Sequence, residues 1–458
     1  MFKTNYLWII IFSLICSCSS NSRSVSCDSK EDIDYDNVID VIDNCISDEA
    51  VKNAEFIDPC TGCMKVSTST TSKKIINLKT YLEISGSMKG YMPGKKGKST
   101  SFQKDMASLF SWLVTNVNAS SKKFYGIKDD KTTIEFESKD DVASKISRAN
   151  FSFGATTTLP DLVENVINQN KKEDVSIIVS DFLYSPPNMM NLEGTLNVRL
   201  REMFLKHPNM ALSVYAFKSD FVGRFYTVSN QTVLNCCSDK RPYYVWVLGE
   251  QSLVEQIDKI INEKNINFLK ELHVGKTYKK IEGEILSQSG RDETSIWQRK
   301  AECGNIITEG KIRDGERLTY TIGLNLNNLP TYYKNKTYLQ DNLKAVSSNS
   351  STQIKTIRTY SEFKKNINPE DVVLAKKYTH FVEVKTVSVD DPCKATINLE
   401  LKSSLPKWID TWNTESDETD AERSERTVLL KRIFSGINEA YENEILFSYQ
   451  YIITASTL

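Results

Sequence analysis

The sequence predicts an α/β protein, with a doubly wound, mostly parallel sheet over residues 75–265 and a β-rich second domain over residues 266–458. Up to residue 265, apolar strand-like runs alternate with segments of helical periodicity, which is typical of parallel α/β domains. Residues 175–179 are apolar but for one serine, as expected of a strand buried on both faces. Beyond residue 265, apolar side chains recur at every second position, which indicates half-buried antiparallel strands.

Each element of the first half follows from a local pattern. Residues 75–84 have the apolar spacing of a strand, whereas Phe102, Met106 and Leu113 recur at helical spacing. Thr158 is a typical N-cap, and Pro160 suits the first turn of the helix that follows it. The other expected strands are 123–126, 132–136, 175–179, 211–217 and 243–248, and the other expected helices are 140–148, 191–205 and 252–261.

The second half alternates with the period of a strand. Apolar residues occupy every second position in residues 318–326 and 395–401, and residues 381–389 form another such strand. An acidic stretch over residues 415–425 precedes a helix that carries Leu430, Ile433, Phe434, Ile437 and Tyr441. We expect a sandwich-like module with a helical insertion and no catalytic constellation. The alternative is a single mixed domain in which these strands extend the first sheet.

Oxygen-bearing side chains follow the strands of the first half. The run Glu83-Ile84-Ser85-Gly86-Ser87 places a carboxylate and two hydroxyls at the end of the first strand. Thr157 follows a glycine turn, and Asp181 ends the apolar strand 175–179. Such residues meet at the carboxyl edge of a doubly wound sheet. Sets made only of oxygen ligands suit hard cations such as Mg²⁺, Mn²⁺ or Ca²⁺.

Together these segments resemble the von Willebrand factor A domain over roughly residues 75–265. In that family they form a metal-ion-dependent adhesion site. The resemblance implies that Ser85, Ser87, Thr157 and Asp181 hold one divalent cation, Mg²⁺ or alternatively Mn²⁺ or Ca²⁺, with Glu83 where the family has Asp. Thr157 is preferred to its neighbour because it lies two residues before Leu159, as in the turn of the family.

The resemblance implies a binding protein and not an enzyme. In the family, an acidic residue of a partner protein completes the coordination of the ion, and we expect the same of an unknown partner here. Glu83 is one methylene longer than Asp, and near-octahedral Mg²⁺ sites tolerate such shifts poorly. The alternative is therefore a structural envelope lipoprotein whose site is a relic without metal.

The first residues predict export and a lipid anchor. Lys3 precedes a short apolar run over residues 6–15, too short to span a bilayer. The following Cys16-Ser17-Cys18 resembles a bacterial lipobox, which implies a signal peptide over residues 1–17 and lipidation at Cys18. We expect a protein anchored in the bacterial cell envelope, in the outer membrane, facing the periplasm or the surface. The alternative is a secretory signal cut near Ser20.

Residues 18–74 are expected to be an acidic, polar linker with a short helix over residues 38–46. A calcium loop over residues 32–43 is the competing interpretation, and a helix there would exclude it. Eight cysteines follow Cys18, and export favours disulfides among them, including a structural role for Cys60 and Cys63.

Composition argues against several other functions. The net charge of -1 gives no reason to expect nucleic acid as a partner. A hydrolase with Ser85 or Ser87 as nucleophile would need a base, and only three histidines are present. Residues 94–99 have the lysine and serine of a phosphate-binding loop but not its glycine spacing, so we expect a basic surface loop there.

Overall fold

The computed structural model describes residues 74–94, 99–129, 133–154, 159–183, 192–228, 232–233, 240–264, 266–275, 281–300, 303–313, 316–390, 393–441 and 445–457. The chain divides into two compact units, residues 1–69 and residues 70–458, and the described residues all belong to the second. Within these ranges no helix has both the length and the apolar character needed to cross a membrane.

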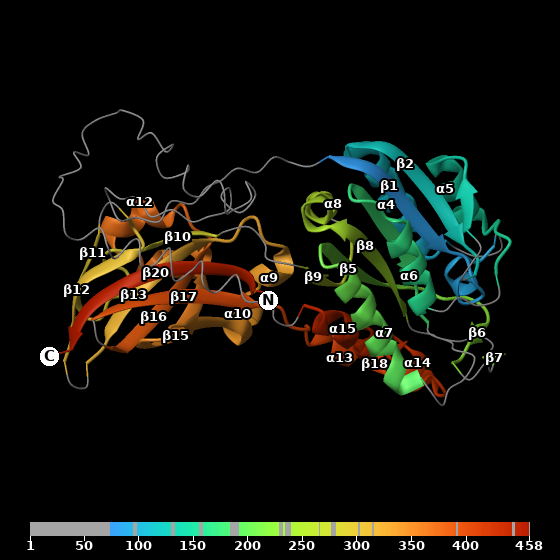
Figure 1. Ribbon diagram of the computed structural model, residues 1–458. Helices are drawn as coiled ribbons and strands as arrows, with labels where there is room; N and C mark the ends of the chain where they lie inside the picture. The colour runs from blue at the N-terminus through green and yellow to red at the C-terminus, as the bar shows by residue number, and fades with distance from the viewer. Residues whose placement is uncertain are drawn as a thin grey trace, which may run out of the picture. The chain divides into compact units, whose positions relative to one another are not determined.

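A seven-stranded mixed sheet forms the first half of the described chain (Figure 1). Its strand order is β3-β2-β1-β4-β8-β5-β9. The strands are β1 (Ile75–Glu83), β2 (Ala119–Ile127), β3 (Thr133–Phe136), β4 (Asp174–Ser180), β5 (Met210–Ser219), β8 (Arg241–Glu250) and β9 (Lys270–Val274). Two short strands, β6 (Phe225–Tyr226) and β7 (Thr232–Val233), lie in the chain segment that connects β5 to β8, and they pair only with each other among the described strands.

The expectation of a mostly parallel sheet is wrong. Strand β1 is parallel to both of its neighbours, β2 and β4, whereas β8 is antiparallel to β4 and to β5. The reason is the connection between β5 and β8, which in the described residues contains no crossover helix, so the chain returns beside β5 in the opposite direction. The apolar runs of these two strands are compatible with either direction, because both faces are buried.

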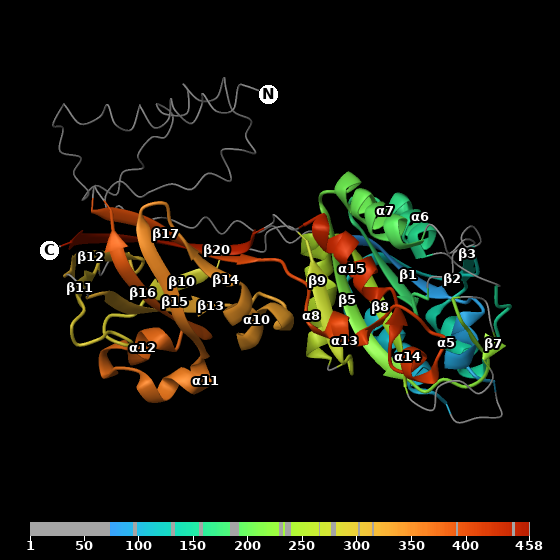
Figure 2. The ribbon, with the colours of Figure 1, turned by 90° about the horizontal axis from the view of Figure 1, so that it is seen from below.

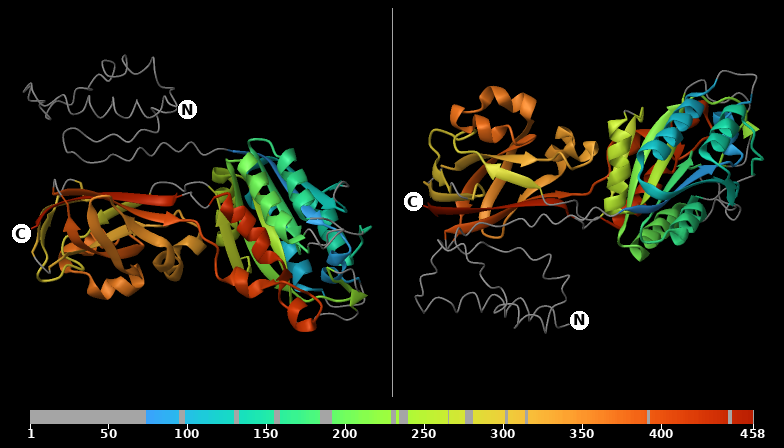
Figure 3. Two further views of the ribbon diagram at one scale, coloured as in Figure 1. Left: turned by 60° about the horizontal axis from the view of Figure 1, so that its bottom comes forward. Right: turned by 90° about the horizontal axis from the view of Figure 1, so that it is seen from above.

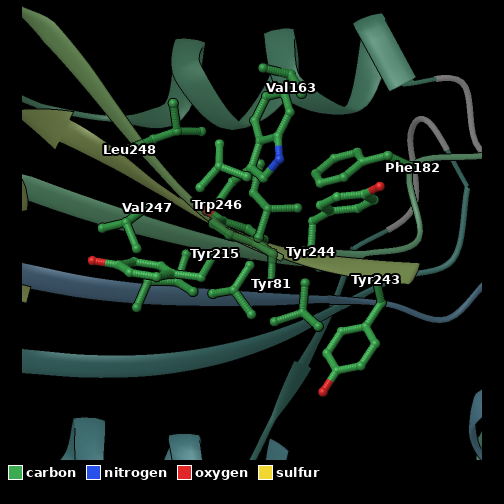
Figure 4. Close-up of a cluster of buried hydrophobic side chains, with 14 of the residues drawn as sticks. Tyr81, Val163, Phe182, Tyr215, Tyr243, Tyr244, Trp246, Val247 and Leu248 are labelled. Carbon is green, nitrogen blue, oxygen red and sulfur yellow. The ribbon is translucent and has the colours of Figure 1, made fainter. Parts of the chain in front are cut away.

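Helices cover both faces of this sheet. They are α4 (Ser101–Asn116), α5 (Lys139–Arg148), α6 (Leu159–Gln169), α7 (Leu192–Lys206) and α8 (Gln251–Glu263). Successive residues of β8 point to opposite faces: Trp246 lies toward Val163 of α6, and Tyr243 points the other way (Figure 4). The ring of Tyr243 packs edge-on against Phe102 of α4. The result is an α/β arrangement with helices on both sides.

The second half contains two further sheets. One has the order β10-β13-β16-β15, and the other has the order β11-β12-β20-β17-β14. Their strands are β10 (Glu282–Ile285), β11 (Ile296–Arg299), β12 (Ile306–Ile312), β13 (Leu318–Asn325), β14 (Leu343–Val346), β15 (Ser350–Thr359), β16 (His380–Val389), β17 (Lys394–Lys402) and β20 (Ile445–Thr457). Inward side chains of both sheets share one core, where the hydroxyls of Tyr320 and Tyr451 lie 3.0 Å apart.

Short helices complete this half. They are α9 (Thr331–Lys334), α10 (Lys336–Asn342), α11 (Tyr360–Phe363) and α12 (Val372–Ala375), with 3-10 turns η4 (Lys364–Asn366) and η5 (Pro369–Asp371). Ser287, Gln288 and Ser289 donate their backbone N–H groups to the buried carboxylate of Asp371. These bonds hold the η5 turn against the turn that follows β10.

The segment between β17 and β20 joins the core of the seven-stranded sheet. It contains α13 (Trp408–Trp412), β18 (Asn413–Thr414), α14 (Asp420–Arg423), β19 (Thr427–Val428) and α15 (Leu430–Glu439). Figures 2 and 3 show α15, in red, beside the green helix α7. A Cβ at Gly436 would lie 2.3 Å from the carbonyl oxygen of Asn197, so glycine permits this close approach of the two helices. The ring of Phe434 lies 5.7 Å from that of Trp246.

Candidate functional site

The site predicted from the sequence lies where β1 and β4 end side by side. These strands are parallel, and Leu82 of β1 pairs with Val179 of β4. The residues after each strand therefore emerge at the same edge of the sheet. Beyond β1 the chain turns at once into the 3-10 helix η2 (Ser87–Tyr91), and beyond β4 it continues through Asp181. This turn brings Ser85 and Ser87 toward Asp181.

Hydrogen bonds connect three of the predicted residues. The hydroxyl oxygens of Ser85 and Ser87 lie 3.0 Å apart, and the Ser87 hydroxyl donates to Oδ1 of Asp181 over 3.2 Å. Ser85 and Asp181 are buried, with exposed fractions of 1% and 2%, whereas Ser87 is half-buried. The two serines and the aspartate therefore form one cluster, which reaches the surface only through Ser87.

Asp181 is incompletely bonded. Its Oδ1 also accepts the backbone N–H of Leu183 at 3.2 Å, but the buried Oδ2 has no hydrogen-bond partner among the residues that the structure describes. Burial raises the pKa of the Asp181 carboxyl, and the Arg241 guanidinium, the Leu183 N–H and the Ser87 hydroxyl lower it by less. A buried carboxylate oxygen without a donor is costly, and a proton or a cation would remove that cost.

Glu83 is bonded to a different residue. Its Oε2 accepts the hydroxyl of Ser180, and the Ser180 oxygen accepts the backbone N–H of Phe182 at 2.8 Å. Phe182 adopts a positive φ of 49°, which bends the chain directly after Asp181. The carboxylate of Glu83 is buried at the same edge of the sheet, but its described hydrogen bond goes to Ser180 at the end of β4 and not to Ser85 or Ser87.

Thr157 and Cys18 lie outside the described residues, as do the lysines expected in the basic loop. The chain leading to Thr157 is described as far as Gly154, whose N–H donates to the carbonyl of Ile84 at 2.8 Å. A Cβ at Gly154 would lie 1.6 Å from the carbonyl oxygen of Lys128, so this position requires glycine. Gly154 thus lies beside Ile84, the residue before Ser85.

Arg241, the first residue of β8, is a charged group that the sequence pattern did not reveal. It is 2% exposed, donates from Nη1 to the carbonyl of Arg423 at 2.6 Å, and lies 4.2 Å over the ring of Phe225. No carboxylate of the described chain lies within ion-pair distance of it, and its Nε has no partner there. Its charge acts on Asp181. A lone arginine before an apolar run gives no signal in a sequence.

The hydrolase alternative gains no support from these contacts. None of the hydrogen bonds of the described histidines goes to Ser85 or Ser87. His273 belongs instead to a buried cluster with Ser213, Asp258 and Glu271. No group of three or more His, Cys, Asp or Glu side chains that could hold a metal occurs in the described ranges. Any ion at the candidate site would therefore depend on hydroxyl ligands.

Comparisons with protein-family models, curated proteins and solved structures found no match to this chain.

Proposed function

We propose that this protein binds one divalent cation through Ser85, Ser87, Thr157 and Asp181, with Glu83 beside them, and uses that ion to bind an acidic residue of a partner protein. The observation that carries the proposal is the buried Oδ2 of Asp181, for which the described residues supply no donor although the hydroxyls of two serines lie close to this carboxylate. A hard cation with an open coordination position attracts carboxylates strongly. The proposed activity is binding and not catalysis.

The spacing of the oxygens supports this proposal. With Mg²⁺–oxygen bonds of roughly 2.1 Å, neighbouring ligands of an octahedron lie about 3.0 Å apart. The separations here are 3.0 Å from Ser85 to Ser87 and 3.2 Å from Ser87 to Asp181. Hydrogen bonds between oxygens have similar lengths. A small cation could therefore replace these bonds with little movement of the side chains.

We also propose that the first half is a variant of the von Willebrand A fold and that the β-rich second half is a separate domain, except for the segment between β17 and β20, which packs into the core of the first half. Support comes from the helices on both faces of the sheet and from the serine turn and Asp181, which meet where the parallel strands β1 and β4 end. The antiparallel strand β8 between β4 and β5 is the departure.

The lipid anchor remains part of the proposal. Attachment through Cys18 would hold the binding site at a membrane of the bacterial envelope. Cys18→Ala should yield a protein that is not acylated and leaves the membrane fraction. Retention of the acyl group in this variant would contradict the assignment.

Calorimetric titration tests the ion site. Mg²⁺ or Mn²⁺ titrated into residues 70–458, the second compact unit, should give saturable heats, and Asp181→Asn should abolish them. Asp105→Asn is the matched control, because it makes the same substitution in the same half of the chain, at a carboxylate that accepts the hydroxyl of Tyr243 and lies outside the candidate site. Equal heats in all three proteins, or none in the unmodified chain, would reject a metal at this site.

Arg241 favours the second candidate, an envelope protein whose site holds no metal. A buried cation whose charge reaches Asp181 opposes the entry of a dication and partly replaces it. If Arg241 has this role, Arg241→Met should bind Mn²⁺ although the unmodified chain does not. Binding by the unmodified chain would support the metal-dependent function instead.

A further inference from the structure

A basic pocket lies on the sheet β10-β13-β16-β15 of the second half, apart from the candidate ion site. It has a volume of about 260 Å³ and is lined by Arg317, Thr319, Gln353, Ile354, Lys355 and Lys385. Three of its six lining residues carry a positive charge, and none carries a negative charge. No motif marked it in the sequence, because its residues come from separate strands.

The register of the sheet explains why these side chains converge. Lys385 of β16 pairs with Thr319 of β13 on one side and with Gln353 of β15 on the other. Paired residues of neighbouring strands point to the same face. Their neighbours Tyr320 and Val384 lie in the core, so Thr319, Lys385 and Gln353 lie on the opposite face of the sheet, where Thr319 is buried, Lys385 is half-buried and Gln353 is exposed. Arg317 lies just before β13, and Lys355 lies in β15 where its pairing with β16 is irregular.

The positive charges of the pocket are incompletely balanced. Lys355 pairs with Glu383 at 3.0 Å, but Glu383 is shared with Arg358 at 3.2 Å. Arg317 reaches Asp292 only at 3.8 Å. Lys385 has no carboxylate within ion-pair distance among the described residues. The three cations that line the pocket and Arg358 beside it are therefore offset by two carboxylates, and a cleft with such an excess of positive charge concentrates anions.

We propose that this pocket binds a phosphate group. A dianion matches the excess positive charge, whereas a carboxylate would neutralise only half of it. Arginine and lysine are the usual ligands of phosphate, and Gln353 adds an amide donor. The small volume admits a head group and not a large organic ligand. A phosphorylated lipid head group and a free phosphate share this chemistry. The inference is independent of the ion site.

The test compares two lysine variants. Inorganic phosphate is titrated into residues 70–458, the second compact unit, in the presence of a chelator, and binding is followed by the NMR shifts of the pocket residues. Saturable binding is expected, and Lys385→Gln should weaken it at least tenfold. Lys311→Gln is the control, because Lys311 is an exposed lysine of β12 and does not line this pocket.

A vesicle arm distinguishes the two sources of phosphate. Phosphatidylcholine vesicles with and without phosphatidic acid are sedimented with each variant. Tighter binding to phosphatidic acid than to inorganic phosphate, lost in Lys385→Gln alone, identifies a lipid head group, and equal affinities identify free phosphate. Absence of saturable binding to either probe, or equal weakening by both substitutions, would overturn the proposal. Because chelator is present, these outcomes do not depend on the divalent cation.

Discussion

Two buried polar clusters of the seven-stranded sheet differ in how completely their atoms are bonded. In the closed cluster, Asp258 accepts from Ser213 at 2.8 Å and from Tyr215 at 2.6 Å, so both of its oxygens are used. Both ring nitrogens of His273 are also bonded, at 2.8 Å to Ser213 and at 3.0 Å to Glu271. In the open cluster of Ser85, Ser87 and Asp181, one carboxylate oxygen has no partner in the described chain.

The closed cluster is more charged and yet more suited to a structural role. Burial lowers the pKa of His273, but Asp258 and Glu271 raise it by more, to about 9. The histidine is therefore charged at neutral pH and paired with both carboxylates. Its surroundings are complete: the hydroxyl of Tyr333 donates to the His273 carbonyl, and Trp408 donates from Nε1 to the carbonyl of Glu271 at 3.0 Å.

Burial and charge alone therefore do not mark a functional site in this molecule. The closed cluster has a serine, a histidine and an aspartate, the residue types of a hydrolase. All three are buried, and the hydroxyl of Ser213, the ring nitrogens of His273 and the oxygens of Asp258 are already hydrogen-bonded within the cluster. It fastens the edge strand β9 to α9 and α13, which covers an edge that could otherwise pair with another chain. The unsatisfied oxygen of the open cluster is the better indication of binding.

The largest expected effect is on the closed cluster. Asp258→Ala leaves His273 charged beside one carboxylate and removes the acceptor of two hydroxyls. We expect a loss of about 3–5 kcal/mol in the free energy of unfolding, measured with urea. Asp105→Ala, which removes an acceptor from Tyr243 alone, should cost about 1 kcal/mol. Equal losses in the two variants would remove the distinction between a network and a single bond.

The closed cluster also predicts a pH dependence. Because the pKa of His273 is raised from 6.5 to about 9 by folding, the folded chain holds more protons than the unfolded chain between these values. The stabilisation is complete below pH 6.5 and is lost as the pH rises through 9. The free energy of unfolding, measured at three pH values in this window, should fall steadily as the pH rises. NMR titration of the His273 ring provides the control, and a ring pKa at or below 6.5 would contradict the charged pair.

The stability of the open cluster should depend much less on its carboxylate. Asp181→Asn removes a buried charge whose Oδ2 has no described donor, so in chelator we expect a change within about 1 kcal/mol. Magnesium at a hundred times its dissociation constant should stabilise the unmodified chain by roughly 2.7 kcal/mol and the variant not at all. Thermal unfolding with and without the ion measures both effects. A large loss in chelator would mean that the open cluster, like the closed one, is structural.

Local patterns predicted the helices and strands well, because each kind of element has its own spacing of apolar side chains. The expected helix 140–148 corresponds to α5 (Lys139–Arg148), and the expected strand 175–179 lies within β4 (Asp174–Ser180). Strand direction was not predictable. The runs 211–217 and 243–248 are buried on both faces, so nothing in their spacing distinguishes a parallel neighbour from a hairpin.

The site was predictable as far as it follows strand ends. Ser85, Ser87 and Asp181 come together because each follows a strand and the two strands are neighbours. Arg241 and the closed cluster were not predictable, because they join segments far apart in the chain and carry no periodic signal. Asp258 lies in α8 and His273 lies in β9, and only the folded sheet brings their side chains to 3.4 Å. The role of Thr157 stays a prediction.

The smallest effect concerns the extra methylene of Glu83. Glu83→Asp shortens the side chain that now accepts the Ser180 hydroxyl, so this bond should be lost at a cost of about 1 kcal/mol in chelator. Ser180→Ala removes the same bond from the other side and should cost a similar amount. The two variants differ in the ion site, because only the shorter carboxylate restores the aspartate that the resembling family has at this position. We therefore expect Glu83→Asp to bind Mg²⁺ more tightly than the unmodified chain, and Ser180→Ala to show no gain, by calorimetry of the two side by side. A gain in both would assign the effect to release of the Glu83 carboxylate, and a gain in neither would mean that the length of this side chain does not limit the open cluster.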